Sequence, residues 1–116
     1  MPELVFFRRG DEVLRFGLGK ERVVLGRGER SDVVIPDADV SRQHVALLYD
    51  GKRCKLEDLS GKGTLVAGKL MKHGELPDGA DIALGQWRAV FRERGSGLAV
   101  ALARGDEQAD RAGVAD

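Results

Sequence analysis

The stretch that decides the fold is residues 24–68, which read VLGRGERSDVVIPDADVSRQHVALLYDGKRCKLEDLSGKGTLVAG. Short apolar runs alternate in it with polar segments, namely Gly26-Arg27, Ser41-Arg42-Gln43-His44, Ser60-Gly61-Lys62-Gly63-Thr64 and Val66-Ala67-Gly68. Each polar segment follows an apolar run that is typical of a β-strand. The spacing therefore predicts loops that meet at one end of a β-sandwich, where a rigid scaffold can present polar groups for binding.

Length and composition indicate one turn-rich domain. The 116 residues are enough for a single hydrophobic core, and 16 glycines against 3 prolines indicate tight turns rather than disorder. We expect residues 1–94 to form the domain. Residues 95–116, rich in Gly, Ala and Asp, are predicted to be a linker or C-terminal tail that could carry one further strand or short helix.

The charges predict which partners the chain does not contact. Lys plus Arg and Asp plus Glu are equal at 19 each, so no net field draws the chain to nucleic acid or to an anionic membrane, and an anion must be bound locally. Cys54 is the one cysteine, which excludes an intrachain disulfide and favours a reducing, cytoplasmic location. A metal site would need carboxylates beside His44 and His73, so we expect neither metal nor cofactor.

Short strands follow one another along the chain without an amphipathic helix between them. The predicted strands are residues 4–8, 13–16, 22–25, 33–35, 45–49, 53–59, 64–66, 69–71, 81–84 and 86–92. Residues 76–80 are predicted to be a turn-rich connection, and Asp50-Gly51 predicts a hairpin turn. This pattern indicates an all-β sandwich or barrel. Phe6, Phe16, Trp87 and Phe91 are expected in the core, and Cys54 is expected to be a buried thiol.

Over residues 4–92 the sequence resembles the forkhead-associated (FHA) family of phosphothreonine-peptide-binding domains. The family pattern is Gly-Arg, then Ser-x-x-His, Ser-x-Asn-Gly-Thr and Val-Asn-Gly, and the four polar segments quoted above occur in this order. Residues 31–35 (SDVVI) and 81–85 (DIALG) are similar to two further strands of the family. The resemblance implies an all-β fold: a β-sandwich of two twisted, mainly antiparallel sheets with the recognition loops at one end.

The resemblance also implies which residues bind the ligand. A phosphothreonine carries about −1.5 to −2 charges and three acceptor oxygens, so it needs charged donors. By their places in the motifs, Arg27 and Ser41 would contact the phosphate, and Arg42 and Lys62 would add cationic reach. Gln43 and Gly61, and also Arg30, lie on the same loops and would contact flanking residues of the peptide. Gly26, His44, Gly63 and Thr64 would support the site structurally.

Two residues depart from the family pattern. Lys62 stands where the family usually has asparagine before Gly-Thr, and Ala67 stands where it has the asparagine of Val-Asn-Gly. In the family the first asparagine hydrogen-bonds the peptide backbone as both donor and acceptor, whereas lysine offers donors only. We therefore expect a weaker hold on the peptide backbone, with phosphate capture kept or strengthened by the added charge.

Two rival functions compete with phosphothreonine binding. Catalysis is disfavoured, because Lys62 is not followed directly by Ser or Thr as in a P-loop, and Ser41 with His44 lacks a nucleophile elbow. A phospho-independent dimerisation or domain-docking module is the second rival. Lys62, Asp37 and Asp39 favour it, and the two aspartates could repel a phosphate or fold back onto Arg27 and occupy it when no ligand is present.

The function implied by the resemblance is a non-catalytic signalling module. It would recognise phosphothreonine on a partner that a Ser/Thr kinase has phosphorylated. The small domain followed by a Gly- and Ala-rich tail would suit the N-terminal sensor of a bacterial regulator, such as a transcription activator, whose native chain carries a further C-terminal effector domain.

Overall fold

All the regular structure in the described part of the chain is β-strand. The fold is taken from a computed structural model that describes residues 1–19 and 21–94, and the predicted tail at residues 95–116 lies outside the described residues. The strands are β1 (Glu3–Arg8), β2 (Asp11–Gly17), β3 (Arg22–Gly26), β4 (Val33–Val34), β5 (Val45–Tyr49), β6 (Cys54–Asp58), β7 (Thr64–Val66), β8 (Lys69–Met71), β9 (His73–Leu76), β10 (Asp81–Leu84) and β11 (Trp87–Arg92).

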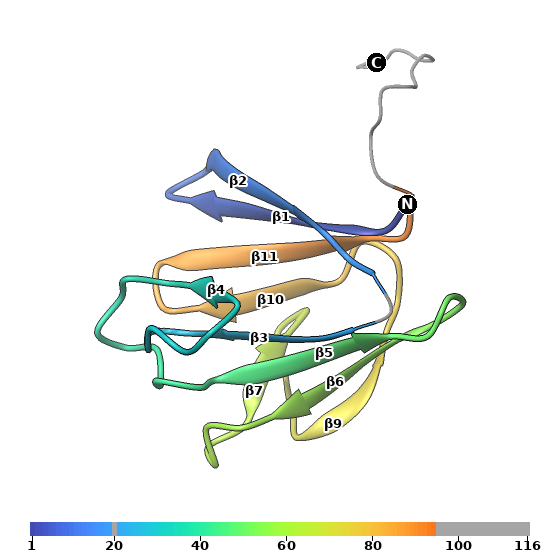
Figure 1. The fold of residues 1–116 in the computed structure, drawn as a ribbon. Coiled ribbons are helices and arrows are strands. Elements are labelled where there is room, and N and C mark those ends of the chain that lie inside the picture. Colours follow the sequence, from blue (N-terminus) through green and yellow to red (C-terminus); the bar gives the residue numbers. More distant parts are fainter. Residues whose placement is uncertain (20, 95–116) are drawn as a thin grey trace.

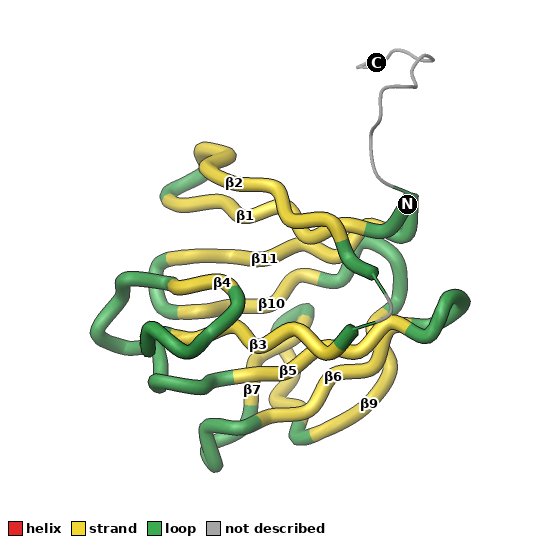
Figure 2. The backbone as a smooth tube through the Cα atoms, in the orientation of Figure 1, coloured by secondary structure: helices red, strands yellow, loops and turns green. Residues whose placement is uncertain are grey.

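The strands form the two sheets of a β-sandwich, which confirms the predicted fold class (Figure 1). One sheet has the order β2-β1-β11-β10-β7-β8 and the other the order β4-β3-β5-β6-β9. The strand pairs are antiparallel except β3 with β4, which run parallel. In Figure 2 the loops that follow β3, β4 and β6 gather at the left of the view, at one end of the sandwich.

The core lies between the sheets, and buried residues alternate with exposed ones along β6 and β7, whereas β1, β3 and β5 each bury at least three consecutive residues. In β6, Cys54 and Leu56 are buried, and Lys55 and Glu57, which each follow one of them in the sequence, are exposed. Phe6 and Phe91 are fully buried. Phe16 and Trp87 are partly buried and pack against the same cluster. The predicted aromatic core is thus confirmed, although two of its members sit at its margin.

Strand β9 was not predicted. Its sequence, His73-Gly74-Glu75-Leu76, contains neither a β-branched nor an aromatic residue, so local propensity favours no strand there. It forms because it pairs antiparallel with β6, which places Glu75 opposite Lys55. The predicted connection at residues 76–80 therefore begins one residue later, after Leu76.

Cys54 is a buried thiol, as predicted. Its side chain is 1% exposed on the inner side of β6. Burial raises the pKa of this thiol to about 11, with a further contribution from the charge of Asp50. At neutral pH the thiol is therefore protonated and a poor nucleophile.

In the described residues, no helix has the length and apolar character needed to cross a membrane.

Alanine substitutions at Leu47 and Leu48 test the assignment of the two faces of β5. Leu47 is 1% exposed and Leu48 is 44% exposed. We expect Leu47→Ala to lower the free energy of unfolding by about 2–5 kcal/mol, because it leaves a cavity in the core, and Leu48→Ala by less than about 1 kcal/mol. Urea denaturation followed by the fluorescence of Trp87 measures both losses. Equal losses in the two variants would contradict the assignment.

Candidate phosphate-binding site

Backbone hydrogen bonds join the loop after β3 to the loop before β5. The backbone N–H of Arg27 donates to the carbonyl of Ser41 at 2.9 Å, and that of Gly28 donates to the carbonyl of Arg42 at 2.9 Å. The side-chain hydroxyl of Ser31 also donates to the Arg42 carbonyl, at 2.9 Å. Two of the predicted segments, Gly26-Arg27 and Ser41-Arg42, are therefore held side by side.

Gly26 is required for this close approach. A Cβ atom at Gly26 would lie 2.2 Å from the carbonyl oxygen of Arg42 and 2.8 Å from the hydroxyl of Ser31. Backbone atoms cannot move away as a flexible side chain can, so any larger residue would push the two loops apart. Its predicted supporting role thus has a geometric basis.

His44 connects the loop before β5 to its neighbours. Its ring Nδ1 accepts a hydrogen bond from the backbone N–H of Ser41 at 3.1 Å. The backbone N–H of His44 donates to the carbonyl of Leu25. The backbone carbonyl of His44 accepts from the N–H of Leu59 at 2.8 Å and from that of Ser60 at 3.1 Å. Burial lowers the pKa of His44, although the nearby Asp58 carboxylate opposes this effect. A neutral ring is the form that can accept at Nδ1, so the low pKa favours the observed bond.

Asp58 organises the loop between β6 and β7, and the sequence did not reveal this role. One carboxylate oxygen accepts from the Ser60 hydroxyl at 2.7 Å and from the Thr64 hydroxyl at 2.8 Å. The other accepts from the backbone N–H groups of Gly61 and Gly63, each at 3.0 Å. An aspartate two residues before a serine and glycine is a known turn signal, which could have identified it.

These hydrogen bonds govern the acidity of Asp58. Partial burial raises its pKa, but the bonds from Ser60, Thr64 and Gly63 outweigh burial and bring the pKa to about 2. The carboxylate is therefore ionised at neutral pH, which strengthens the hydrogen bonds that it accepts. Both of its oxygens accept hydrogen bonds from residues 60–64.

Gly63 and Thr64 complete the support of this loop. Gly63 has a φ of +87°, and a Cβ there would lie 2.7 Å from the side chain of Leu70. Thr64 is 0% exposed, and its hydroxyl is bound to Asp58. Both residues are buried, and their supporting role stays a prediction.

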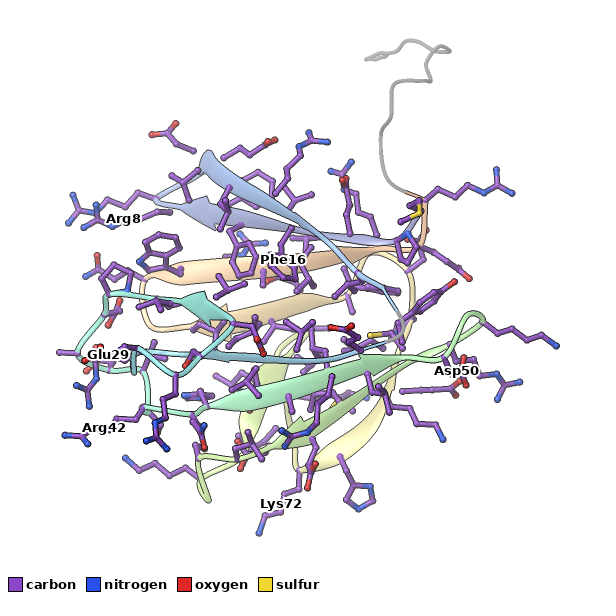
Figure 3. All side chains as sticks on the ribbon, viewed as in Figure 1. Arg8, Phe16, Glu29, Arg42, Asp50 and Lys72 are labelled. Carbon is purple, nitrogen blue, oxygen red and sulfur yellow. The ribbon has the colours of Figure 1, made fainter. Side chains whose placement is uncertain are left out.

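Three arginines line an open depression at this end of the sandwich. It has a volume of about 840 Å³ and is lined by Arg27, Gly28, Glu29, Arg30, Arg42 and Gln43. Figure 3 shows Glu29 and Arg42 near each other at this end, opposite Asp50. The Arg27 Nε donates to the carbonyl of Val40 at 3.0 Å, which fixes the guanidinium and leaves its terminal nitrogens for a ligand. The depression thus carries positive charge on a positioned scaffold.

Within the described part of the chain, the arginines of the depression have no carboxylate partner. Among residues 1–19 and 21–94, the ion pairs are made by Arg15, Arg22, Arg53 and Arg88, and none involves Arg27, Arg30 or Arg42. An anion from outside can therefore bind these groups without displacing an internal salt bridge.

Gly61 and Lys62 stand apart from this depression. Both are exposed on the β6–β7 loop, and neither belongs to its lining. Ser41 is half-buried and is placed beside Arg27 through the backbone hydrogen bond between them. Of the predicted contact residues, Arg27, Arg42 and Gln43 therefore share one concave surface with Arg30, and Lys62 lies outside this surface on a separate loop.

Asp37 does not occupy Arg27, contrary to one of the expectations. Its carboxylate accepts from the backbone N–H of Gln86 at 2.8 Å and from that of Asp39 at 2.9 Å. These two bonds lower the pKa of Asp37. The carboxylate also lies against Gly85 in the turn between β10 and β11. It is engaged there and not available to mask the arginine.

Comparison with known proteins assigns the family. The model of the FHA domain matches residues 23–85, more than half of the chain. The chain belongs to the FHA domain family.

Two curated relatives come from Mycobacterium tuberculosis and Corynebacterium jeikeium. FhaA of Mycobacterium tuberculosis, an FHA domain-containing protein, is 36% identical over 70 residues, which are 60% of this chain and 13% of FhaA. The oxoglutarate dehydrogenase inhibitor of Corynebacterium jeikeium is 31% identical over 96 residues, which are 78% of this chain and 67% of the inhibitor. The chain thus corresponds to a small part of FhaA and to about two thirds of the inhibitor.

Solved structures of FHA domains share the fold. The FhaA FHA domain, crystallised in complex with the intracellular domain of a second protein, has a TM-score of 0.71 and 30% identity, covering 79% of this chain and 100% of that one. Mycobacterium tuberculosis EmbR, in complex with a low-affinity phosphopeptide, has a TM-score of 0.68 and 25% identity, covering 78% of this chain and 24% of EmbR.

The Asp58 carboxylate predicts a step in the pH dependence of folding. Because its pKa is about 2 in the folded chain against 3.8 for a free aspartate, its contribution is complete above about pH 4 and is lost as the pH falls through about 2. The free energy of unfolding should fall over this range. In Asp58→Asn, which does not titrate, this part of the fall should be absent, and stability at neutral pH should be lower by about 1–3 kcal/mol. Identical pH profiles, measured by urea denaturation, would contradict this role.

Proposed function

We propose that this domain is a non-catalytic module that binds a phosphothreonine peptide of a partner phosphorylated by a Ser/Thr kinase. Arg27 and Ser41 are the central phosphate contacts, and Arg42 and Lys62 add cationic reach. The observation that carries the proposal is the cluster of arginines that make no ion pair with any described residue, joined by backbone hydrogen bonds to the loop that bears Ser41.

The chemistry of phosphate fits this cluster. A guanidinium can donate two parallel hydrogen bonds to phosphate oxygens, and charge-assisted bonds of this kind are stronger than neutral ones. Arg27 is held through its Nε by the Val40 carbonyl, so little side-chain entropy remains to be lost when its terminal nitrogens bind. The Ser41 hydroxyl, on the neighbouring loop, can supply a further donor.

The phosphothreonine that binds is not a residue of this domain. Thr64 is the one threonine in the sequence. It is 0% exposed, and its hydroxyl is bound to Asp58, so it is inaccessible to a kinase in the folded state. The ligand therefore belongs to a separate protein or to a part of the native chain outside these 116 residues.

The geometry around Ser41 and His44 favours binding over catalysis. The Nδ1 of His44 accepts from the backbone N–H of Ser41, and His44 is fixed by its own backbone bonds to two further segments. A catalytic histidine would instead accept the proton of the serine hydroxyl. The same residues that suggest a nucleophile and its base thus serve to shape the loop.

We place the domain in cytoplasmic bacterial signalling, as the sensor of a longer regulator such as a transcription activator. The identities to FhaA of Mycobacterium tuberculosis and to the Corynebacterium jeikeium inhibitor support a bacterial setting. The likeness to EmbR, captured with a phosphopeptide, supports the ligand class. Phosphatase treatment of the bound partner separates this function from phospho-independent docking, because a docking module would retain its partner.

Removal of the Arg27 side chain tests the proposed function. Arg27→Ala should weaken binding of a phosphothreonine peptide, chosen from a degenerate library, by about tenfold or more, since each charge-assisted hydrogen bond contributes about 1.5–3 kcal/mol. Isothermal titration calorimetry measures the affinity, with the unphosphorylated and phosphoserine peptides as ligand controls. Arg53→Ala is the matched control, because it removes an exposed arginine from the turn between β5 and β6, which lies at the opposite end of the sandwich (Figure 1). Unchanged affinity in Arg27→Ala would show that the site is misassigned.

Restoration of the family residue at position 62 tests how the peptide backbone is held. Lys62→Asn should raise the affinity for the phosphothreonine peptide about two- to tenfold at high salt, because asparagine provides both a donor and an acceptor to the peptide backbone. The affinity of the variant should also depend less on salt, since one cation is lost. Weaker binding of Lys62→Asn at every salt concentration would instead mean that Lys62 is a principal phosphate ligand.

A further inference from the structure

The outer face of the six-stranded sheet carries a row of apolar side chains. Directly opposed residues of neighbouring strands lie on the same face of a sheet. From β8 to β2 the register aligns Leu70, Leu65, Ala83, Arg88, Phe7 and Glu12 in this way. Leu65 is 46% exposed and Leu70 is 63% exposed, while Phe7 and Ala83 are half-buried. Most of this row is therefore apolar surface that a partner can reach.

A second row lies beside the first on the same face. It consists of Asp81, Val90, Val5 and Arg15. Val5 is 0% exposed, yet it does not belong to the core cluster between the two sheets. Its side chain is thus covered on the outer face by the side chains around it. The outer face is therefore a closely packed layer, as a surface that packs against a second sheet needs to be.

The charges of this face cancel. It carries three acidic and three basic residues, namely Glu3, Glu12 and Asp81 against Arg15, Arg88 and Arg92. Arg15 pairs with Glu3 at 3.3 Å and with Glu12 at 2.6 Å. Arg88 pairs with Asp81. A two-fold interface brings the same surface of two copies together, so a net charge on it would repel the second copy. This face carries none.

The outer face of the five-stranded sheet is less suited to self-association. Leu48, Lys55 and Lys72 line a groove of about 730 Å³ there. The two lysines make no ion pair with any residue in the described part of the chain, and the glutamates of the groove already pair with arginines. Two copies that met through this face would bring the lysines together, which is unfavourable.

We propose that the outer face of the six-stranded sheet is a dimer interface and that its partner is a second copy of this chain. Six strands about 4.8 Å apart, with about six residues of 3.3 Å each, give a face of roughly 25 by 20 Å, or about 500 Å². Two such faces bury roughly 1,000 Å², which is near the lower limit for a specific interface. The dimer is accordingly weak and reversible. This inference goes beyond the proposed function and does not depend on it.

A dimer of this kind leaves the candidate phosphate-binding sites open. The loops that follow β3, β4 and β6 gather at one end of the sandwich and do not belong to the outer face of the sheet (Figure 2). Each dimer therefore carries two accessible sites. If the proposed function holds, two linked sites retain a partner with two phosphothreonines longer than one site does.

Sedimentation velocity of the 116-residue chain over about 5–500 µM, the range of a weak interface, tests this inference. The sedimentation coefficient of the wild type should rise with concentration from that of a monomer towards that of a dimer. Leu65→Glu should raise the dissociation constant at least about tenfold, because it buries a carboxylate in the interface. Leu48→Glu is the matched control, since Leu48 is 44% exposed on the other sheet, and it should dimerise as the wild type does. Thermal denaturation verifies that each variant is folded.

Reversal of the charge at Arg88 tests the role of charge balance separately. Its side chain is 59% exposed, so the substitution does not disturb the core. Arg88→Glu gives each outer face an excess of negative charge. Dimerisation of this variant should be weaker than that of the wild type at low salt, and added salt should restore part of it by screening. Unchanged dimerisation at low salt would overturn the placement of Arg88 in the interface.

The other outcomes also decide the inference. A wild type that stays monomeric over the whole concentration range would overturn it. A dimer that persists in Leu65→Glu would likewise overturn it, and its loss in Leu48→Glu would place the contact on the five-stranded sheet. Calorimetric titration with a phosphothreonine peptide is independent of these results, because Leu65 lies outside the candidate site. Folded Leu65→Glu should bind the peptide within about twofold of wild type, so failure of peptide binding in both would overturn the proposed function alone.

Discussion

The contact between the backbone of Arg42 and the end of β3 at Gly26 is the constraint on which the site depends. A Cβ atom at position 26 would lie 2.2 Å from the Arg42 carbonyl oxygen, so the two segments can meet only where β3 ends in glycine. This single carbonyl accepts from both Gly28 and Ser31. Backbone atoms thereby set how the two arginine-bearing loops lie relative to each other, and backbone atoms are less free to move than side chains.

Three aspartates, Asp32, Asp37 and Asp58, accept hydrogen bonds from backbone N–H groups, and in residues 1–19 and 21–94 none of them makes an ion pair with an arginine of the depression. Asp58 accepts the hydrogen bonds that shape the β6–β7 loop. Asp37 accepts from Gln86 and Asp39, and Asp32 accepts from the N–H of Val24 at 2.7 Å. Each carboxylate is stabilised by local N–H donors, so it does not need an arginine as partner. A chain of zero net charge can in this way present a positively charged surface.

Most of the fold could be predicted from local sequence patterns, but several features of the site could not. The alternation in residues 86–92 and the Asp50-Gly51 turn identified strands correctly because they depend on neighbours in the chain. Strand β9 was missed because it exists through its pairing with β6. Two roles were considered for Asp37, repelling a phosphate or folding back onto Arg27, but its carboxylate lies against Gly85, a contact across a long stretch of sequence that no local pattern encodes. The role of Asp58 likewise depends on Thr64, which lies beyond the loop.

The most direct test of this account is a map of amide chemical shifts recorded on titration with a phosphothreonine peptide and with its unphosphorylated counterpart. If the loops form one preorganised anion site, the phosphorylated peptide alone should shift the amides of residues 27–31 and 41–44 and of the β6–β7 loop, and the outer faces of the two sheets should stay unchanged. Equal shifts with both peptides, centred on the outer face of the sheet that contains β5 and β6, would contradict it and identify the domain as a phospho-independent docking module.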